Sequence, residues 1–238
     1  MRLKILQWNT WFKEDIKNKL AFLQEINADI YCLQELNVNE DINEFELLKS
    51  KVKLEGALAI ADTDHGGQGN AVLSKFPIES SESYFIKEPV EPRKHFSDEG
   101  RVYLETKLKL KNRNLVVGTT HMSYTDAFEE NPLKKQESDN LLKILKDYSN
   151  GYVFAGDLNT PEDSLLIKKL ERLFKHAGPD YSEKTWTTKD FGYNGFKVNS
   201  LDYRLDYVFA TRDIKVVDAK IIQTKYSDHL PILAEIYI

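Results

Sequence analysis

Two polar side chains follow directly on a short apolar run near the middle of the chain. The segment GYVFAGDLNT (151–160) predicts a buried strand over 152–155, because these residues are aromatic, β-branched or small and too few for a helix. Gly156 would then turn the chain at the strand end, and Asp157 and Asn159, two residues apart, would project the same way. Ligands of α/β sheets bind beyond the carboxyl ends of strands, where this tip would lie. Taken alone, the motif fits an Asx turn before a helix about as well.

Other apolar segments end in the same way, in a carboxylate, an amide or an imidazole. Carboxylate and amide oxygens are hard donors that suit Mg²⁺ or Mn²⁺, which proteins usually hold with one or two carboxylates, waters and substrate phosphate oxygens. The set lacks cysteine and zinc-type histidine spacings, so zinc is the weaker option. A cationic histidine beside such a metal would stabilise charge on a phosphoryl group, so phosphoester chemistry fits best. The residues at these strand ends are Asn9, Glu35, His121, Asp157, Asn159, Asp206, Asp228 and His229.

These side chains need a framework of alternating strands and helices to hold them. Helical spacing of apolar residues predicts helices over 15–27, 41–49, 131–147 and 161–174, the last capped by Thr160 with Pro161 in its first position. Apolar or alternating runs predict strands over 3–8, 30–34, 58–61, 70–74, 83–86, 101–110, 115–120, 152–155, 203–210, 214–222 and 231–238.

Three connections of the chain carry polar or aromatic residues without periodicity. Asp62, Asp64 and His65 lie in a Gly-rich segment (62–69), where a solvated loop is favoured over a metal site. The two longest aperiodic segments, 87–100 and 177–199, are candidates for substrate selection. Neither an internal repeat nor a linker is visible, so we expect a single domain over 1–238.

Composition narrows the class of protein. With 238 residues, 41% of them hydrophobic, the chain can bury a substantial core. Its net charge of −5 argues against extensive, non-specific electrostatic binding of nucleic acid. Cys32 is the only cysteine, so disulfides are excluded and a buried thiol is expected. The start of the chain does not read as a signal sequence, and no run is long enough to cross a bilayer. We therefore expect a cytoplasmic, soluble monomer without stable membrane association.

Seven short motifs, taken together, resemble the endonuclease/exonuclease/phosphatase superfamily, whose members have a deoxyribonuclease I-like fold. They occur in the family's order and cover essentially the whole chain. The resemblance implies an α/β fold of two packed mixed β-sheets flanked by helices, a four-layer sandwich with one divalent-metal site at the strand ends. The motifs are QWN (7–9), LQE (33–35), GNAVLSKFPI (69–78), TTH (119–121), GDLN (156–159), RLDYVF (204–209) and SDHLPI (227–232).

The resemblance also implies a role for each residue at the strand ends. Asn9 and Glu35 match the family's metal-binding amide and carboxylate, and Asp228 is similar to the acid that approaches the metal from the other side. Mg²⁺ is the implied ion, with Mn²⁺ as a substitute.

The remaining residues correspond to the family's catalytic groups. Asp157 matches the residue that orients or deprotonates the attacking water, and Asn159 matches the one that holds a phosphate oxygen. His229 resembles the catalytic histidine, and Asp206 resembles the acid that pairs with it. Whether Asp157 or His229 takes the proton stays open.

His121 indicates a branch of the superfamily. It resembles the phosphate-contacting histidine of the deoxyribonuclease I, sphingomyelinase, deadenylase and tyrosyl-DNA phosphodiesterase branches, whereas the exonuclease III branch uses a tyrosine-containing segment there. Abasic-site repair is therefore disfavoured. A lipid substrate is also disfavoured, because the sequence shows no apolar hairpin rich in exposed aromatics and no secretion signal.

We expect a Mg²⁺-dependent phosphodiesterase that acts on nucleic acid or a nucleotide-like substrate by in-line attack of water. The alternatives are a phosphomonoesterase, a lipid-headgroup phosphodiesterase and a catalytically dead binding module; the last predicts missing site residues, and every expected position is filled.

Substrate contacts are expected from three parts of the chain. Arg101 would contact phosphate or form a surface ion pair. Trp186 and the other aromatic residues of 177–199 would stack on bases or pack their own loop, Arg93, Lys94 and His95 would meet a backbone phosphate, and Trp8 and Trp11 are expected to be packing residues.

Overall fold

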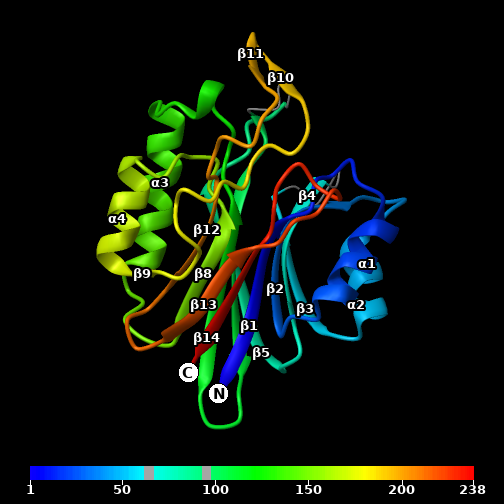
Figure 1. Ribbon diagram of the computed structural model, residues 1–238, viewed down its shortest axis with the longest axis vertical. Coiled ribbons are helices and arrows are strands. Elements are labelled where there is room, and N and C mark those ends of the chain that lie inside the picture. The colour runs from blue at the N-terminus through cyan, green and yellow to red at the C-terminus, as the bar shows by residue number, and fades with distance from the viewer. Residues whose placement is uncertain (62–66, 93–97) are drawn as a thin grey trace.

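Two six-stranded mixed β-sheets packed face to face form the centre of the protein, with two helices on each outer side (Figure 1). The computed structural model describes residues 1–61, 67–92 and 98–238. The first sheet has the order β13-β14-β1-β2-β4-β3 and the second the order β5-β6-β7-β8-β12-β9. This arrangement confirms the predicted four-layer α/β sandwich.

The first sheet contains one parallel pair, β1 with β2, and its other neighbours are antiparallel. Helices α1 (Ile16–Ile26) and α2 (Glu44–Val52) lie on its outer side (Figure 1). Its strands are β1 (Arg2–Asn9), β2 (Ile30–Val38), β3 (Glu55–Ile60), β4 (Gly67–Ser74), β13 (Lys215–Ile221) and β14 (Ile232–Tyr237).

The second sheet also has a single parallel pair, β7 with β8. Helices α3 (Pro132–Leu145) and α4 (Leu165–Leu173) cover it, and a short hairpin, β10 (Phe191–Tyr193) and β11 (Phe196–Val198), projects beyond its edge (Figure 1). Its strands are β5 (Ile78–Lys87), β6 (Arg101–Lys109), β7 (Asn114–His121), β8 (Tyr152–Asp157), β9 (Lys175–His176) and β12 (Asp206–Ala210).

Apolar residues fill each interface between layers. Ile5 and Val72 of the first sheet meet Val117 and Val153 of the second in the central core. Separate cores lie beneath α1 and α2 and beneath α3 and α4. Because β1 is parallel to β2 and β7 is parallel to β8, the carboxyl ends within each pair lie at one edge of their sheet. Asn9 at the end of β1 contacts Asp157 at the end of β8, so the two edges coincide and the polar end residues come together.

The predicted end of the second strand at Glu35 was wrong. Strand β2 runs on to Val38 through an irregularity between Leu33 and Leu36, where Glu35 has a left-handed backbone with a φ of 58°. A β-bulge of this kind changes the direction of a side chain without ending the strand.

The segment after β8 also differs from the prediction. Helix α4 begins at Leu165, and Ser164 is its N-cap, since the Ser164 hydroxyl accepts a hydrogen bond from the Ile167 N–H. Thr160 and Pro161 lie before the helix. Gly156 lies within β8 and makes no turn there; a Cβ at this position would lie 2.4 Å from the Thr120 carbonyl oxygen, so the close approach of β7 requires glycine.

Several loop predictions need correction or lie outside the described residues. The Gly-rich loop is shorter than predicted because β4 begins at Gly67, and the aperiodic segment 177–199 contains the β10–β11 hairpin. The residues that lie outside the described part of the chain are Asp62, Asp64, His65, Arg93, Lys94 and His95.

Cys32 is buried, as predicted. Among the described residues, no helix has the length and apolar character to cross a membrane.

Candidate active site

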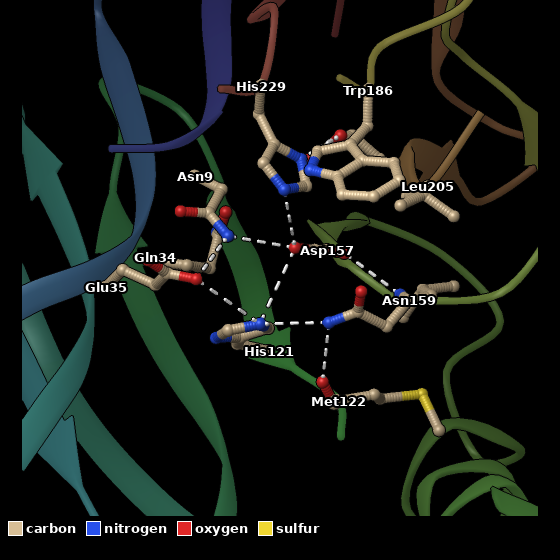
Figure 2. Close-up of polar contacts among 12 residues, drawn as sticks. Asn9, Gln34, Glu35, His121, Met122, Asp157, Asn159, Trp186, Leu205 and His229 are labelled. Atoms are coloured by element: carbon tan, nitrogen blue, oxygen red, sulfur yellow. Dashed lines mark hydrogen bonds and ion pairs between the residues drawn. The ribbon is translucent and has the colours of Figure 1, made fainter. Parts of the chain in front are cut away.

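Asn9 joins carboxylates of the two sheets at the common strand edge. Its Nδ2 donates to Glu35 Oε1 at 3.0 Å and to Asp157 Oδ2 at 2.9 Å (Figure 2). Asn9 ends β1 and Asp157 ends β8, while the bulge in β2 turns the Glu35 side chain toward them. The structure thus brings together three of the predicted site residues from strands far apart in the sequence.

A second buried group lies beside this one and consists of His229, Asp206 and Gln7. His229 Nδ1 lies 2.8 Å from Asp206 Oδ2, and Gln7 Nε2 donates to Asp206 Oδ1 at 2.7 Å. On the other side of the ring, His229 Nε2 lies 3.6 Å from Asp157 Oδ2. Burial lowers the pKa of His229, but the negative charges of Asp206 and Asp157 outweigh it and hold this pKa well above the usual value. His229 is therefore an imidazolium placed between two carboxylates.

The carboxyl of Asp157 is the point where the two groups meet. Burial raises the pKa of Asp157, and the charge of Asp206 adds to this, while His229 and the hydrogen bond from Asn9 oppose it. The Asn159 backbone N–H donates to its other oxygen at 2.9 Å. A carboxyl with a raised pKa next to a cation is suited to accept or share a proton near neutral pH.

His121 has a different protonation state from His229. Burial lowers the pKa of His121 well below the usual value, and the charges of Arg101 and His229 lower it further, so this ring is neutral. Asn159 Nδ2 lies 3.0 Å from His121 Nε2 and donates to the Met122 carbonyl at 2.9 Å (Figure 2). Because the amide nitrogen is the donor, His121 accepts at Nε2 and carries its proton on Nδ1. The site therefore contains one charged and one neutral histidine.

Glu35 and Asp228 supply oxygen donors that fit a divalent ion. Both line the same cleft, and burial together with the charge of Asp228 raises the pKa of Glu35, as expected for two acids held near each other without a cation. Oxygen donors of this kind suit Mg²⁺ or Mn²⁺. Asn9 is placed beside them, but its oxygen accepts from the Trp11 N–H at 3.0 Å, so ligation through that oxygen requires the amide to turn over.

Asp157, Asp206 and His229 form another group whose donor atoms lie within 4.8 Å of one another. We do not assign the metal to this group. Both oxygens of Asp206 are already engaged by the Gln7 amide and the His229 ring, and His229 Nδ1 needs its proton for that contact. The group holds a proton instead, and Glu35 and Asp228 remain the better ligands.

A cleft of about 480 Å³ opens above these residues. Its floor contains Glu35, His121, Asp157, Asp228 and His229. Its walls are mainly aromatic, with two lysines and one acid, Asp190, and they come from the loop after β1, from the loop after β7 and from the segment that leads into β10. The wall residues include Trp11, Phe12, Lys13, Tyr124, Phe128, Trp186, Lys189, Phe191 and Tyr193.

The comparison with known proteins identifies the family of the chain. Residues 6–229 match the sequence pattern of the Endonuclease/Exonuclease/phosphatase family. The chain belongs to this family. Members of the family hydrolyse phosphoesters and are generally dependent on a divalent metal. No curated protein matches the chain by sequence.

Solved structures of the endonuclease/exonuclease/phosphatase family share the fold at low sequence identity. An endonuclease/exonuclease/phosphatase from Beutenbergia cavernae has a TM-score of 0.78 and 19% identity over 99% of this chain and 71% of its own. The human Nocturnin catalytic domain with bound sulfate has a TM-score of 0.71 and 18% identity over 99% and 93%. A Bacteroides thetaiotaomicron mannosyl-6-phosphatase has a TM-score of 0.73 and 14% identity over 99% and 100%.

Trp186 has a role in this family member that the sequence did not indicate. The side chain is only 3% exposed, and its Nε1 donates to Asp228 Oδ2 at 3.2 Å. Edge contacts with Phe128 and Phe191, at ring-centroid distances of 5.0 and 4.9 Å, hold the indole in place. Trp186 therefore orients the carboxylate of Asp228 and offers little free face for stacking. In this segment, Tyr193 is the exposed ring, at 48%.

Trp11 was predicted to be a packing residue, and this was wrong, whereas Trp8 is fully buried as predicted. Trp11 lines the cleft because it lies two residues after Asn9, and a residue this close to a site residue stays at the same edge. That proximity in the sequence was a usable signal for Trp11, Phe12 and Lys13. Gln7 belongs to the QWN motif, but its contact with Asp206 could not be read from the sequence, since the two residues are 199 positions apart.

Arg101 lies apart from the residues that line the cleft. It is 6% exposed, its Nη2 lies 3.4 Å from a Glu99 oxygen, and its Nε donates weakly to Ser123 Oγ at 3.4 Å. It affects the site through its charge, which lowers the pKa of His121. Direct phosphate contact by Arg101 stays a prediction, and these contacts do not support it.

Proposed function

We propose that the protein is a divalent-metal-dependent phosphodiesterase that hydrolyses a phosphoester of nucleic acid or a nucleotide-like substrate by attack of water. The observation that carries this proposal is the charged His229, held between Asp206 and Asp157, next to the oxygen donors Glu35 and Asp228. General acid–base groups and a hard-metal site in one cleft are what phosphoester hydrolysis requires.

Each residue of the site contributes a distinct property. An ion held by Glu35 and Asp228, with Asn9 beside them, would supply Lewis acidity toward a phosphoryl oxygen. Asp157, whose pKa is raised by burial, would orient the attacking water and accept its proton. His229 would donate a charge-assisted hydrogen bond from Nε2 to an anionic oxygen, while Asp206 keeps Nδ1 protonated.

The walls of the cleft support a substrate with aromatic and anionic parts. Lys13 Nζ and Lys189 Nζ each lie 5.9 Å from the centre of the Trp11 ring, so two cations flank an aromatic face within the cleft. Tyr193 is exposed in the wall formed by the β10–β11 hairpin. Bases stack on aromatic faces and lysines contact backbone phosphates, which favours a nucleic acid or nucleotide.

A phosphomonoesterase is the second candidate. The structural similarity to a mannosyl-6-phosphatase favours it, because the two chains align over nearly their whole lengths. The two candidates share the metal site and differ in whether the phosphate carries one or two organic groups. A small sugar phosphate would make few contacts with the aromatic and basic residues of the walls. We therefore place the phosphodiester first.

A substrate panel tests the proposal. Metal-stripped protein would be assayed with Mg²⁺ or Mn²⁺ on an oligonucleotide, 5′-tyrosyl DNA, a chromogenic phosphodiester, mannose 6-phosphate and sphingomyelin, with His229→Ala as the control for contaminating hydrolases. We expect metal-dependent cleavage of the nucleic-acid substrates that His229→Ala abolishes. Turnover of the monoester alone would favour the second candidate. Equal turnover by the wild type and by His229→Ala would contradict both.

A further inference from the structure

Lys134 is a buried cation that bonds to both loops carrying site residues. It lies in the first turn of α3, is 2% exposed, and donates from Nζ to the carbonyl oxygens of Ser123 and Leu158, the latter at 3.1 Å. Ser123 is two residues beyond His121. Leu158 lies between Asp157 and Asn159. One ammonium group thus connects the loop after β7 to the loop after β8.

Glu137, one turn further along α3, holds the first of these loops from a second direction. Its carboxylate accepts from the Ser123 backbone N–H at 3.0 Å and from the Ser123 hydroxyl. Glu137 is fully buried and balances the charge of Lys134. The backbone N–H, hydroxyl and carbonyl of Ser123 are therefore all bound by two residues of one helix.

The two loops also bond to each other on the side of the site. The Met122 N–H donates to the Asp157 carbonyl at 3.0 Å, and Asn159 Nδ2 donates to the Met122 carbonyl at 2.9 Å while it contacts His121 (Figure 2). A shift of either loop would therefore change the separation of His121, Asn159 and Asp157. Lys134 bonds the same two loops from helix α3.

Burying a lysine to hold two loops costs free energy, because the charged amine loses its contact with water. Burial lowers the pKa of Lys134 to about 8, while Glu137 and Asp157 oppose this, so the amine keeps its proton at neutral pH. Apolar residues of similar volume often stabilise a core more than a buried ion pair does. A cation with three donors, however, fixes the positions of the carbonyl oxygens that it binds.

We propose that Lys134 is a positioning residue, which sets the spacing between the His121 loop and the Asp157–Asn159 loop for the reaction. The inference rests on the proposed function of the site. It is distinct from a purely structural role, in which Lys134 would stabilise the fold without affecting turnover beyond that.

The chain offers a matched control in Lys19. Lys19 is also fully buried, and its Nζ lies 2.9 Å from a Glu44 oxygen in an ion pair between α1 and α2. This pair belongs to the opposite outer layer and does not bond to either loop. Lys19→Met should therefore remove the same kind of group from the scaffold alone.

The experiment compares Lys134→Met with Lys19→Met by melting temperature, kcat and KM, at a temperature where both variants are folded. We expect both to lose melting temperature. Only Lys134→Met should lose kcat, by about 100-fold for loops displaced by an ångström, with KM within about threefold. Lys134→Arg, which keeps the charge and several donors, should recover part of the loss. Equal kcat in Lys134→Met and Lys19→Met would overturn the proposal.

A second measurement does not depend on turnover. The side-chain amide resonances of Asn159 should shift in Lys134→Met and stay unchanged in Lys19→Met, and an unchanged Asn159 in both would overturn the proposal. If the wild type shows no phosphoester hydrolysis, the proposed function fails. The Asn159 resonances still test whether Lys134 sets the spacing between the two loops. If Lys134→Met does not fold, Glu137→Gln undergoes the same measurements with the same expected directions.

Discussion

The indole N–H of Trp186 donates to the Asp228 carboxylate at 3.2 Å, so an aromatic side chain of the segment that leads into β10 orients a residue of the proposed metal site. Partners that orient a ligating carboxylate affect metal affinity although they do not touch the metal. This contact connects the substrate wall of the cleft to its floor.

Trp186→Phe tests this contact, because phenylalanine keeps most of the ring packing and removes the N–H. We expect the Mg²⁺ concentration for half-maximal activity to rise about tenfold, since Asp228 loses a fixed donor. The melting temperature should fall somewhat, because the smaller ring leaves space in the buried cluster around Trp186, so the metal requirement is measured at a temperature where the variant is folded. Metal titration of the activity is the measurement, and an unchanged requirement would show that Asp228 is oriented without the indole.

Glu35→Gln should raise the metal requirement more strongly. The substitution replaces a charged oxygen donor by a neutral one of the same shape, so metal affinity should fall by at least about tenfold while the fold is kept. Glu79→Gln, at an exposed position beside Lys107, is the control and should have no effect. Turnover that persists in both proteins after exhaustive chelation would contradict a metal-dependent reaction.

Asp206 should act through His229. Asp206→Asn and His229→Ala should each reduce kcat on the order of 10³-fold, and the double variant should be little worse than the poorer single one, because the two side chains form one hydrogen-bonded unit. Single-turnover kinetics of the three variants measures this. Multiplicative losses in the double variant would mean that the two residues contribute independently.

The cleft walls should select the substrate. Lys13→Ala and Tyr193→Ala should each raise KM for an oligonucleotide about tenfold, which corresponds to one lost stacking or phosphate contact. Hydrolysis of a small chromogenic phosphodiester should be unchanged, because the floor of the cleft is untouched. Tyr237→Ala, an exposed tyrosine near the end of β14, is the control. Equal losses on both substrates would assign these side chains to the scaffold.

His176 should make stability depend on pH. Burial and the charge of Arg204 lower the pKa of His176 to about 4, while its ring packs on Tyr181 at 4.3 Å. The unfolded chain binds this proton near pH 6.5, so the contribution is complete above pH 6.5 and is lost as pH falls toward 4.

Thermal unfolding of His176→Phe and the wild type between pH 7 and pH 5 measures this effect. The variant should lose less melting temperature on acidification, by a few degrees at about 2–4 °C per kcal/mol for a chain of this length. The other titrating groups are common to both proteins and cancel in the comparison. Parallel losses in the two proteins would show that His176 does not titrate as stated.

Most of the framework was predictable from local patterns. Apolar periodicity predicted the helices and most of the strands. Asn9, His121 and Asp157 were recognised as polar residues at strand ends, and the parallel pairing of the strands explains why they meet at one edge. The bulge at Glu35 was not predictable, because it depends on how β2 pairs with β4. The start of α4 was missed because Thr160 and Ser164 are both good caps, and packing against the second sheet decides between them.

The roles of Trp186 and Lys134 could not be read from the sequence for a related reason. An aromatic residue in an aperiodic loop and a lysine in an otherwise ordinary helix carry no local sign that their polar atoms meet a carboxylate or two carbonyl groups. Such contacts depend on the packed arrangement of separate elements. The motifs alone therefore indicated the residues of the site and left out the residues that hold them.

The site is divided between the two sheets: Asn9 and Glu35 belong to the first, and His121, Asp157 and Asp206 belong to the second. Neither sheet carries a complete set of reacting groups, so the enzyme exists as a catalyst only while the two sheets stay docked. A partly denatured form that keeps its secondary structure but loosens the central core should be inactive. During denaturation, turnover should therefore be lost before the far-ultraviolet circular dichroism signal, which reports secondary structure, begins to fall.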